Sequence, residues 1–342
     1  MVGRSYIRLV SKLLPFEDPN HFLDPGDIGP ELPPPPEELV WHYTKHWTLE
    51  IILAAHILRA SDIRSMNDTK ELHQGIKRVR QAFKKLERDW DYRDGGPEIE
   101  FGELKEELDI AAGAAFDGSA FVTSFSRAKD STDQWKAYAK PDGFAIGIPR
   151  DVRLSVLGVE PETYPRGQYI EETPLRWITL RYRKADQIAQ AEEGLGRLMS
   201  ELGEASYVSA KHDDMDLGSI FRDRAKSVYV DSVAAIKHKA FKSEREVRYA
   251  VTRPSAPAAI KVDPSTGREY IELTGALPDP FDRDWQPNDP EYYQSTPARL
   301  PIRAICVGPG NPFAHTKVEV ERWLSSAGYS GVDIIKSKSP LR

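Results

Sequence analysis

Residues 241–251 have the sequence FKSEREVRYAV, and the rest of the chain can be organised around this stretch. From Glu244 to Val251, apolar residues alternate with charged ones, a pattern of period two that predicts a β-strand. The charged set consists of Glu244, Glu246 and Arg248. At about 3.4 Å per residue, these three side chains lie on one strand face within roughly 14 Å. Such a face is either solvated or part of a functional site.

The overall composition is that of a globular protein with a slightly acidic surface. The chain has 342 residues, 40% hydrophobic and 29% charged, with a net charge of -6. This balance argues against a generally basic surface, though not against a local basic groove. The single cysteine, Cys306, excludes an intramolecular disulfide and a Cys-rich zinc site, and it suits a reducing compartment. No apolar run is long enough for a membrane helix, and the start is too polar for a signal peptide, so we expect a cytoplasmic protein with no membrane partner.

The order of predicted elements indicates an α+β protein. We expect residues 1–38 to form an N-terminal extension with a proline-rich connector, and residues 39–342 to form one domain. Strands dominate the middle and the end of the chain, with helices inserted early and late, which favours a mixed or antiparallel central sheet. Strands are predicted at 39–44, 120–126, 144–148, 177–182, 258–262, 269–273, 302–308 and 332–335, in addition to the stretch above. Helices are predicted at 49–59, 72–90, 102–113, 185–202, 215–238 and 318–327, with a loop at 61–68.

The helix at 72–90 has the clearest periodicity in the chain. Its apolar residues follow one another at spacings of four and three: Leu72, Ile76, Val79, Phe83, Leu86 and Trp90. Its other face carries cations at Lys77, Arg78, Arg80, Lys84, Lys85 and Arg88. We interpret this face as solvated; a contact surface for a phosphate backbone is the alternative.

Several short motifs occur in a characteristic order. They are WHYT at 41–44, SFS at 124–126, QWKAY at 134–138, EREVR at 244–248, ICVGP at 305–309 and SKSPLR at 337–342. Over residues 39–342 this order resembles the AbiGi-type abortive-infection family of bacterial and phage-defence proteins, which looks like a divergent branch of the ADP-ribosyltransferase fold.

The resemblance implies an NAD-dependent ADP-ribosyltransferase that acts as a defence effector or toxin. Glu246, with Glu244 two residues before it, matches the catalytic carboxylate motif. Together with the residue types that NAD cleavage requires, the resemblance implies an NAD-binding set: His42, Tyr43, Ser124, Ser126, Trp135, Tyr138 and Arg248. NAD is then a substrate, no metal is required, and the acceptor is a macromolecule, RNA or protein. An antitoxin or other neutralising partner would fit such an effector.

The residue types suit this chemistry. Breaking the nicotinamide–ribose bond develops positive charge on the ribose ring, as in glycoside cleavage, and a fixed carboxylate opposes that charge. An aromatic ring can stack on the planar nicotinamide, and His and Arg supply donors for the ribose and pyrophosphate. We therefore expect the strands that hold His42, Ser124 and Glu246 to meet at one cleft.

Other interpretations of the same residues remain open. The site could hydrolyse NAD with water as the acceptor, or the chain could be a catalytically inactive recognition module. A metal-dependent nuclease built on Glu244 and Glu246 is a weaker alternative, because no His or Asp accompanies the pair at a metal-ligand spacing. His42, Trp135 and Tyr138 could each be ordinary core residues, the two serines could be polar strand positions, and Arg248 could simply neutralise Glu246.

Overall fold

The computed structural model describes residues 38–65, 69–89, 101–116, 120–150, 152–157, 177–209, 217–254, 259–275 and 297–341. The expected N-terminal extension and proline-rich connector lie outside these residues, apart from residue 38. The described residues group into two compact units. We call them the helical unit, from residues 68–119 and 181–236, and the sheet unit, from residues 37–67, 120–180 and 237–342.

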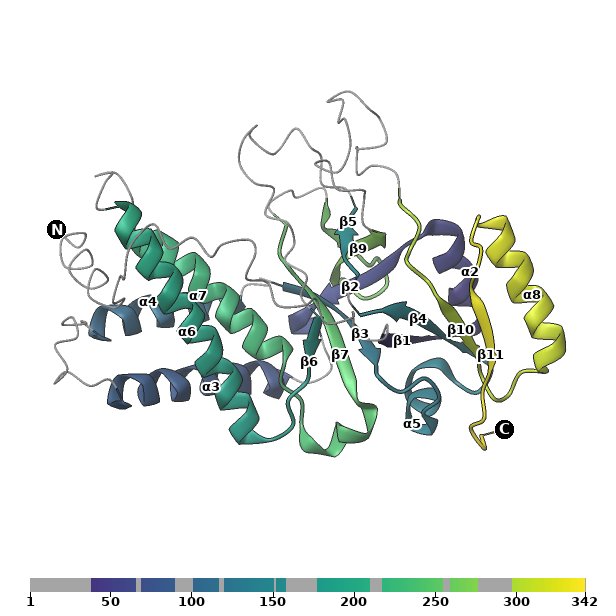
Figure 1. Ribbon diagram of the computed structural model, residues 1–342, viewed down its shortest axis with the longest axis horizontal. Helices are drawn as coiled ribbons and strands as arrows, with labels where there is room; N and C mark the ends of the chain where they lie inside the picture. The colour runs from purple at the N-terminus through teal and green to yellow at the C-terminus, as the bar shows by residue number, and fades with distance from the viewer. Residues whose placement is uncertain are drawn as a thin grey trace, which may run out of the picture. The chain divides into compact units, whose positions relative to one another are not determined.

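The sheet unit contains a large mixed sheet, which confirms the α+β class (Figure 1). In the described residues its strands are β1 (Leu39–Thr44), β2 (Leu58–Asp62), β3 (Ala120–Ser126), β4 (Phe144–Pro149), β5 (Leu154–Val156), β6 (Trp177–Thr179), β7 (Glu246–Thr252), β8 (Lys261–Val262), β9 (Glu269–Gly275), β10 (Ala304–Val307) and β11 (Asp333–Lys336). The order along the sheet is β11-β10-β4-β1-β3-β2-β9-β5, with β7 paired to β3 and β6, and β8 to β9. Among the named strands of the described residues, only β10 and β11 pair in parallel.

One face of this sheet carries the main apolar core of the sheet unit. Val40, Ile146 and Val247 belong to this core, and the helices α2 (His46–Ala55) and α8 (Phe313–Ser326) contribute further apolar side chains to it. The two helices also contact each other. Alternate residues of the same strands, such as Trp41 and Ala145, belong to a second apolar cluster. Because side chains of a strand alternate between faces, the two clusters cover opposite faces of the sheet.

The helical unit has a core of its own. It consists of α3 (Thr69–Asp89), α4 (Phe101–Phe116), α6 (Lys184–Ser209) and α7 (Leu217–Ala234), in agreement with the helices predicted there. Val79, Phe83, Leu104, Leu195 and Tyr229 are buried together. The three-and-four spacing predicted the buried face of α3 correctly at Ile76, Val79, Phe83 and Leu86, because that spacing places the residues on one side of a helix. Trp90 and the side chain of Leu72 lie outside the described part of the chain. Residues 39–342 were expected to form one domain, in which these four helices were not distinguished as a unit.

One predicted helix in the sheet unit was wrong in its extent. A helix was expected over 49–59 and a loop over 61–68, but α2 ends at Ala55 because His56 takes a left-handed conformation with φ 57°. The chain then enters β2, where Leu58, Ala60 and Asp62 are buried in alternation. A short 3-10 helix, Ile63–Ser65, follows.

The stretch at 241–251 is a strand only in its second half. Residues Lys239–Glu244 form a 3-10 helix, η6, and Arg245 is left-handed at φ 48°, ψ 42°. The strand β7 therefore begins at Glu246. Alternation predicted the faces of β7 correctly. It wrongly placed Glu244 on the same strand, because Glu244 ends the 3-10 helix and the left-handed Arg245 interrupts the extended backbone that a strand requires.

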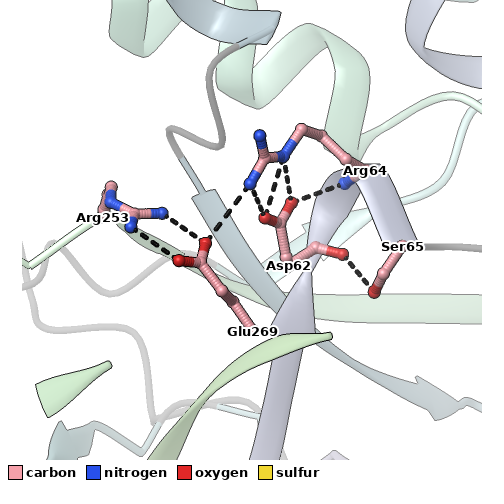
Figure 2. A network of polar contacts seen from close by, with 5 residues as sticks. All are labelled: Asp62, Arg64, Ser65, Arg253 and Glu269. Atoms are coloured by element: carbon pink, nitrogen blue, oxygen red, sulfur yellow. Dashed lines mark hydrogen bonds and ion pairs between the residues drawn. The ribbon is translucent and has the colours of Figure 1, made fainter. Parts of the chain in front are cut away.

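The far end of β7 is fixed by a network of ion pairs (Figure 2). Arg64 Nε donates to Asp62 Oδ2 at 2.9 Å, and Arg64 Nη2 reaches Glu269 Oε2 at 3.3 Å. Arg253, just after β7, makes a two-point contact with Glu269 at 2.8 and 3.1 Å. The two guanidinium groups balance the two carboxylates, so the network links β2, β9 and the end of β7 without net charge.

Among the described residues, no helix is both long and apolar enough to cross a membrane.

Candidate functional site

The predicted serine and glutamate motifs meet on neighbouring strands. In the β3–β7 ladder, Ser124 lies opposite Arg248 and Ser126 lies opposite Glu246. Residues directly opposite in an antiparallel pair share a face, so these four side chains lie on the same side of the sheet. Ser124 Oγ donates a hydrogen bond to Glu246 Oε1 at 2.7 Å. Two motifs separated by 122 residues in sequence thus come into direct contact.

Glu246 is a buried carboxylate held by cations. Only 4% of the residue is exposed. Arg248 Nε donates to its Oε1 at 2.9 Å, and the ammonium of Lys237 makes a short contact with its Oε2. Burial alone would raise the pKa of Glu246, but the charges of Arg248 and Lys237 and the hydrogen bond from Ser124 outweigh it and lower the pKa to about 2. Glu246 is therefore ionised throughout the neutral range.

Glu244 lies at the outer edge of the same cluster. Its carboxylate accepts a hydrogen bond from Lys237 Nζ at 2.5 Å and another from the Tyr138 hydroxyl at 3.3 Å. Its carbonyl oxygen accepts from Ser126 Oγ at 2.7 Å, which ties η6 to β3. Tyr138 is 43% exposed, so it marks the side from which a ligand can approach.

Lys237 is a functional candidate that was not predicted from the sequence. Its ammonium contacts both Glu244 and Glu246, and it lies 5.3 Å from the centroid of the Phe241 ring. Burial favours the neutral amine, but the two carboxylates outweigh this effect and raise the pKa of Lys237. The prediction had assigned residue 237 to the end of a helix. The sequence feature that could have indicated Lys237 as a buried candidate is its position directly after the apolar residues 233–236.

Trp135 and Tyr43 are core residues rather than stacking surfaces. Trp135 is fully buried, and its ring packs edge-on against that of Tyr43 with centroids 4.8 Å apart. Trp135 Nε1 donates to Asp130 Oδ1 at 2.7 Å, and the Tyr43 hydroxyl donates to the carbonyl of Ala128 at 2.7 Å. Neither ring faces solvent, so the packing of the core accounts for both residues, and their role in NAD binding stays a prediction.

The turn that carries Trp135 and Tyr138 explains why these two rings differ. The short helix α5 (Thr132–Gln134) continues into a π-helix, Trp135–Ala139. The turn of a π-helix is wider than that of an α-helix, so residues three apart do not share a face. Trp135 therefore points into the core while Tyr138 reaches Glu244. The two rings, both expected to bind NAD, therefore lie in different surroundings.

His42 lies on the other face of the sheet. Trp41 is the ladder partner of Ser126, so Trp41 shares the face of the serines and His42, one residue on, does not. The His42 ring contacts Phe125 at 5.5 Å, and its Nδ1 lies 3.0 Å from the carbonyl oxygen of Ser124. Burial lowers its pKa despite that hydrogen bond, which favours a neutral imidazole. The strand of His42, β1, pairs with β3, but the His42 side chain does not join the carboxylate cluster.

Two cavities among the described residues are lined by none of the residues of this cluster. One, of about 430 Å³, is lined by α3 residues such as Lys77 and Lys84. The other, of about 520 Å³, is lined by His56, Arg299 and other residues near α8. In the part of the chain that the structure describes, no three His, Cys, Asp or Glu side chains are grouped to hold a metal ion.

Comparison with known families gives one match. A model of a protein family of unknown function, DUF2971, matches residues 134–249. This segment covers about a third of the chain and includes Tyr138, Lys237, Glu244, Glu246 and Arg248. Comparisons with curated proteins and with solved structures gave no significant match.

Proposed function

We propose that the protein is an NAD-dependent enzyme that transfers ADP-ribose to a macromolecule, with Glu246 as its essential carboxylate. The observation that carries this proposal is the 2.7 Å hydrogen bond from Ser124 Oγ to Glu246 Oε1. It joins the two motifs, Ser-x-Ser and Glu-x-Glu, that the resemblance to ADP-ribosyltransferases assigns to one NAD site. The same proposal includes a relationship to the AbiGi-type family and the ADP-ribosyltransferase fold.

The proposed reaction assigns a different role to each carboxylate. The bond between ribose C1′ and the nicotinamide nitrogen breaks, its electron pair leaves with nicotinamide, and positive charge develops on the ribose ring. Glu246, ionised because its pKa is about 2, opposes that charge. The acceptor forms the new bond to C1′ and gives its proton to Glu244, which lies beside the exposed Tyr138. Lys237 must move away from Glu246 during the reaction, because its ammonium otherwise cancels the stabilising charge.

A recognition module without catalysis is the second candidate, and a specific observation favours it. Lys237 and Arg248 both contact Glu246, which is almost completely buried. A carboxylate already neutralised in this way offers little net field to a developing cation. In that case the cluster fixes η6 against β3, and Tyr138 with its surroundings binds a ligand without changing it.

The test combines NAD turnover with NAD binding on the same purified proteins. Labelled NAD is incubated with the protein and a cell lysate, with and without ribonuclease, and the label on macromolecules is measured beside free ADP-ribose. Glu246→Gln should lower turnover about a hundredfold or more, because it removes a charge that acts mainly in the transition state. Binding of NAD, measured by calorimetry, should change little. Glu321→Gln on α8 is the matched control and should behave as the wild type.

The outcomes separate the candidates. Label on a macromolecule supports transfer, whereas free ADP-ribose alone supports NAD hydrolysis at the same site. Normal turnover by a folded Glu246→Gln protein would remove Glu246 from the mechanism. A wild-type protein without any turnover leaves the recognition module as the function.

A further inference from the structure

A strongly basic region surrounds the carboxylate cluster in a chain that is acidic overall. Residues 127–140 and 237–245 together contain eight Lys or Arg and three Asp or Glu, whereas the whole chain has a net charge of -6. Direct contacts hold the two segments together: Arg127 N donates to the carbonyl of Arg245 at 3.0 Å, and Tyr138 bonds to Glu244. The excess positive charge is therefore gathered on one part of the sheet unit.

Of the three acidic residues of this region only Asp133 is exposed, so a single exposed carboxylate stands against the exposed cations and does not neutralise the surface. Asp130 accepts hydrogen bonds from Trp135 Nε1 and Ser337 Oγ, and Glu244 is paired with Lys237. Seven of the eight cations are exposed. Arg127 pairs with Glu38, and the other six are Lys129, Lys136, Lys140, Lys239, Lys242 and Arg245. In the described part of the chain, no carboxylate lies within ion-pair distance of any of these six. The cations of α3 differ, since Arg80, Lys85 and Arg88 each pair with an acid.

Two aromatic rings are exposed within this region. Tyr138 and Phe241 are each 43% exposed, although rings of this size are usually more deeply buried. Both lie close to the same ion pair, Tyr138 through its hydroxyl on Glu244 and Phe241 through the ammonium of Lys237 at 5.3 Å. Exposed rings among unpaired cations are the combination that single-stranded nucleic acids require, because phosphates need charge and unstacked bases need a flat apolar partner.

Two of these cations are in backbone conformations that are unfavourable for their residue type. Lys140 has φ 62° and ψ 166°, a region that glycine adopts almost exclusively, and Arg245 has φ 48°. A glycine at either position would relieve the strain but would remove a positive charge. Strained residues of this kind concentrate at functional sites.

We propose that this basic surface, defined by the six exposed cations other than Arg127 together with Tyr138 and Phe241, binds single-stranded nucleic acid. The cations contact successive phosphates, and the two rings stack on bases beside Glu244 and Lys237. Binding of this kind depends on backbone charge and stacking, so it has little sequence preference. The inference does not depend on NAD chemistry, although it would bring a nucleic-acid acceptor next to the carboxylates.

The test is fluorescence anisotropy of a labelled oligonucleotide of about 20 nucleotides, without NAD, as single strand and as duplex. The variant Lys136→Gln/Lys239→Gln/Lys242→Gln should bind the single strand at least about tenfold more weakly at low salt. It should also reduce the slope of log affinity against log salt by about two, because roughly 0.7 is lost for each phosphate contact on a single strand. The matched control Lys77→Gln/Lys84→Gln/Lys85→Gln removes equal charge from α3 and should bind as the wild type does.

The aromatic rings are tested separately. Phe241→Ala should weaken single-strand binding roughly tenfold without changing the salt slope, because it removes stacking and no charge. Tyr138→Phe keeps the ring and should retain binding, which separates stacking from the bond to Glu244.

Several results would overturn the proposal. They are equal losses in the two triple variants, a preference for duplex, or binding only to anionic vesicles or to an acidic peptide. A protein that binds the single strand but consumes no NAD would support this inference while the proposed enzymatic function fails.

Discussion

Replacing Glu246 by Gln should weaken the fold to a degree that depends on pH. The carboxylate is buried among Lys237, Arg248 and Ser124, and its pKa is about 2 instead of the ordinary 4.5. A pKa that is lower in the folded than in the unfolded protein means that folding favours the ionised form. At neutral pH this difference corresponds to about 3 kcal/mol of stabilisation, to order of magnitude.

The direction of the pH dependence follows from the same pKa. The stabilisation is complete above about pH 4.5 and disappears as the pH falls through about 2, because the folded and unfolded proteins then carry the same proton. The Gln variant lacks this contribution at every pH, and it also leaves Lys237 and Arg248 with one partner fewer. We expect a deficit in the free energy of unfolding of about 3 to 5 kcal/mol at pH 7, which shrinks to about half at pH 3.

Urea unfolding followed by tryptophan fluorescence at pH 7, 5, 4 and 3 measures this deficit. The control is Glu321→Gln, whose carboxylate on α8 lies 3.7 Å from Lys317 and is 53% exposed. An exposed pair contributes little, so its loss should change the free energy of unfolding by less than about 0.5 kcal/mol at any pH.

A deficit for Glu246→Gln below about 1 kcal/mol at pH 7 would contradict the buried ion cluster. A deficit as large at pH 3 as at pH 7 would show that it arises from packing and not from charge.

Three further predictions concern the surroundings of Glu246. Lys237→Met should lower the free energy of unfolding by about 3 to 5 kcal/mol in urea, since two carboxylates lose their shared cation, whereas Lys239→Met on the exposed side should have little effect. Trp135→Ala should lower the free energy of unfolding by about 3 to 5 kcal/mol, and Tyr138→Ala by less than about 1 kcal/mol, because only the Trp135 ring is fully buried. Equal losses in melting temperature would refute the assignment of Trp135 to the core. Lys140→Gly should raise the free energy of unfolding by about 1 kcal/mol, since glycine adopts φ 62°, ψ 166° without strain; a lower melting temperature would mean that the strain is absent.

Local periodicity predicted the elements that depend on one face being buried. The spacing in α3 identified its core residues, and alternation identified the faces of β7. These patterns are reliable because burial of a single face imposes a period of 3.6 or 2 on the sequence. The contact between Ser124 and Glu246 was expected from the resemblance and not from periodicity, which says nothing about pairing between distant strands.

The position of His42 shows what periodicity leaves undetermined. Alternation along β1 separates His42 from Trp41 and Tyr43, but it does not say which set shares a face with Ser124. That depends on the register between β1 and β3, which pairs Trp41 with Ser126. A shift of one residue would have placed His42 beside the carboxylates, and only tertiary packing sets the register.

Lys237 could not be found from local patterns for a related reason. It meets Glu244 and Glu246 only because η6 and the left-handed Arg245 fold the chain back within nine residues. The charged residues of this short segment gave no periodic signal, and the conformation of Arg245 is one that its residue type disfavours.

The connections between the sheet and the inserted helices have a consequence for how much of this chain can be removed. The chain leaves the sheet after β2 and returns at β3, where Asp62 and Phe121 are ladder partners. It departs again after Leu180, and the ends of that second excursion are joined by a 2.6 Å hydrogen bond from Arg181 N to the carbonyl of Ala235. Each insertion is thus closed at its base, so a short turn could replace it without moving the strands.

The two insertions nevertheless depend on each other. Phe83 and Leu104 come from the first and Leu195 and Tyr229 from the second, and all four share one core. Deleting one insertion would expose the apolar side chains of the other to water, and exposed apolar patches promote aggregation. A minimal version of this protein must therefore lose both insertions in a single step, and any natural shortening would have had to do the same.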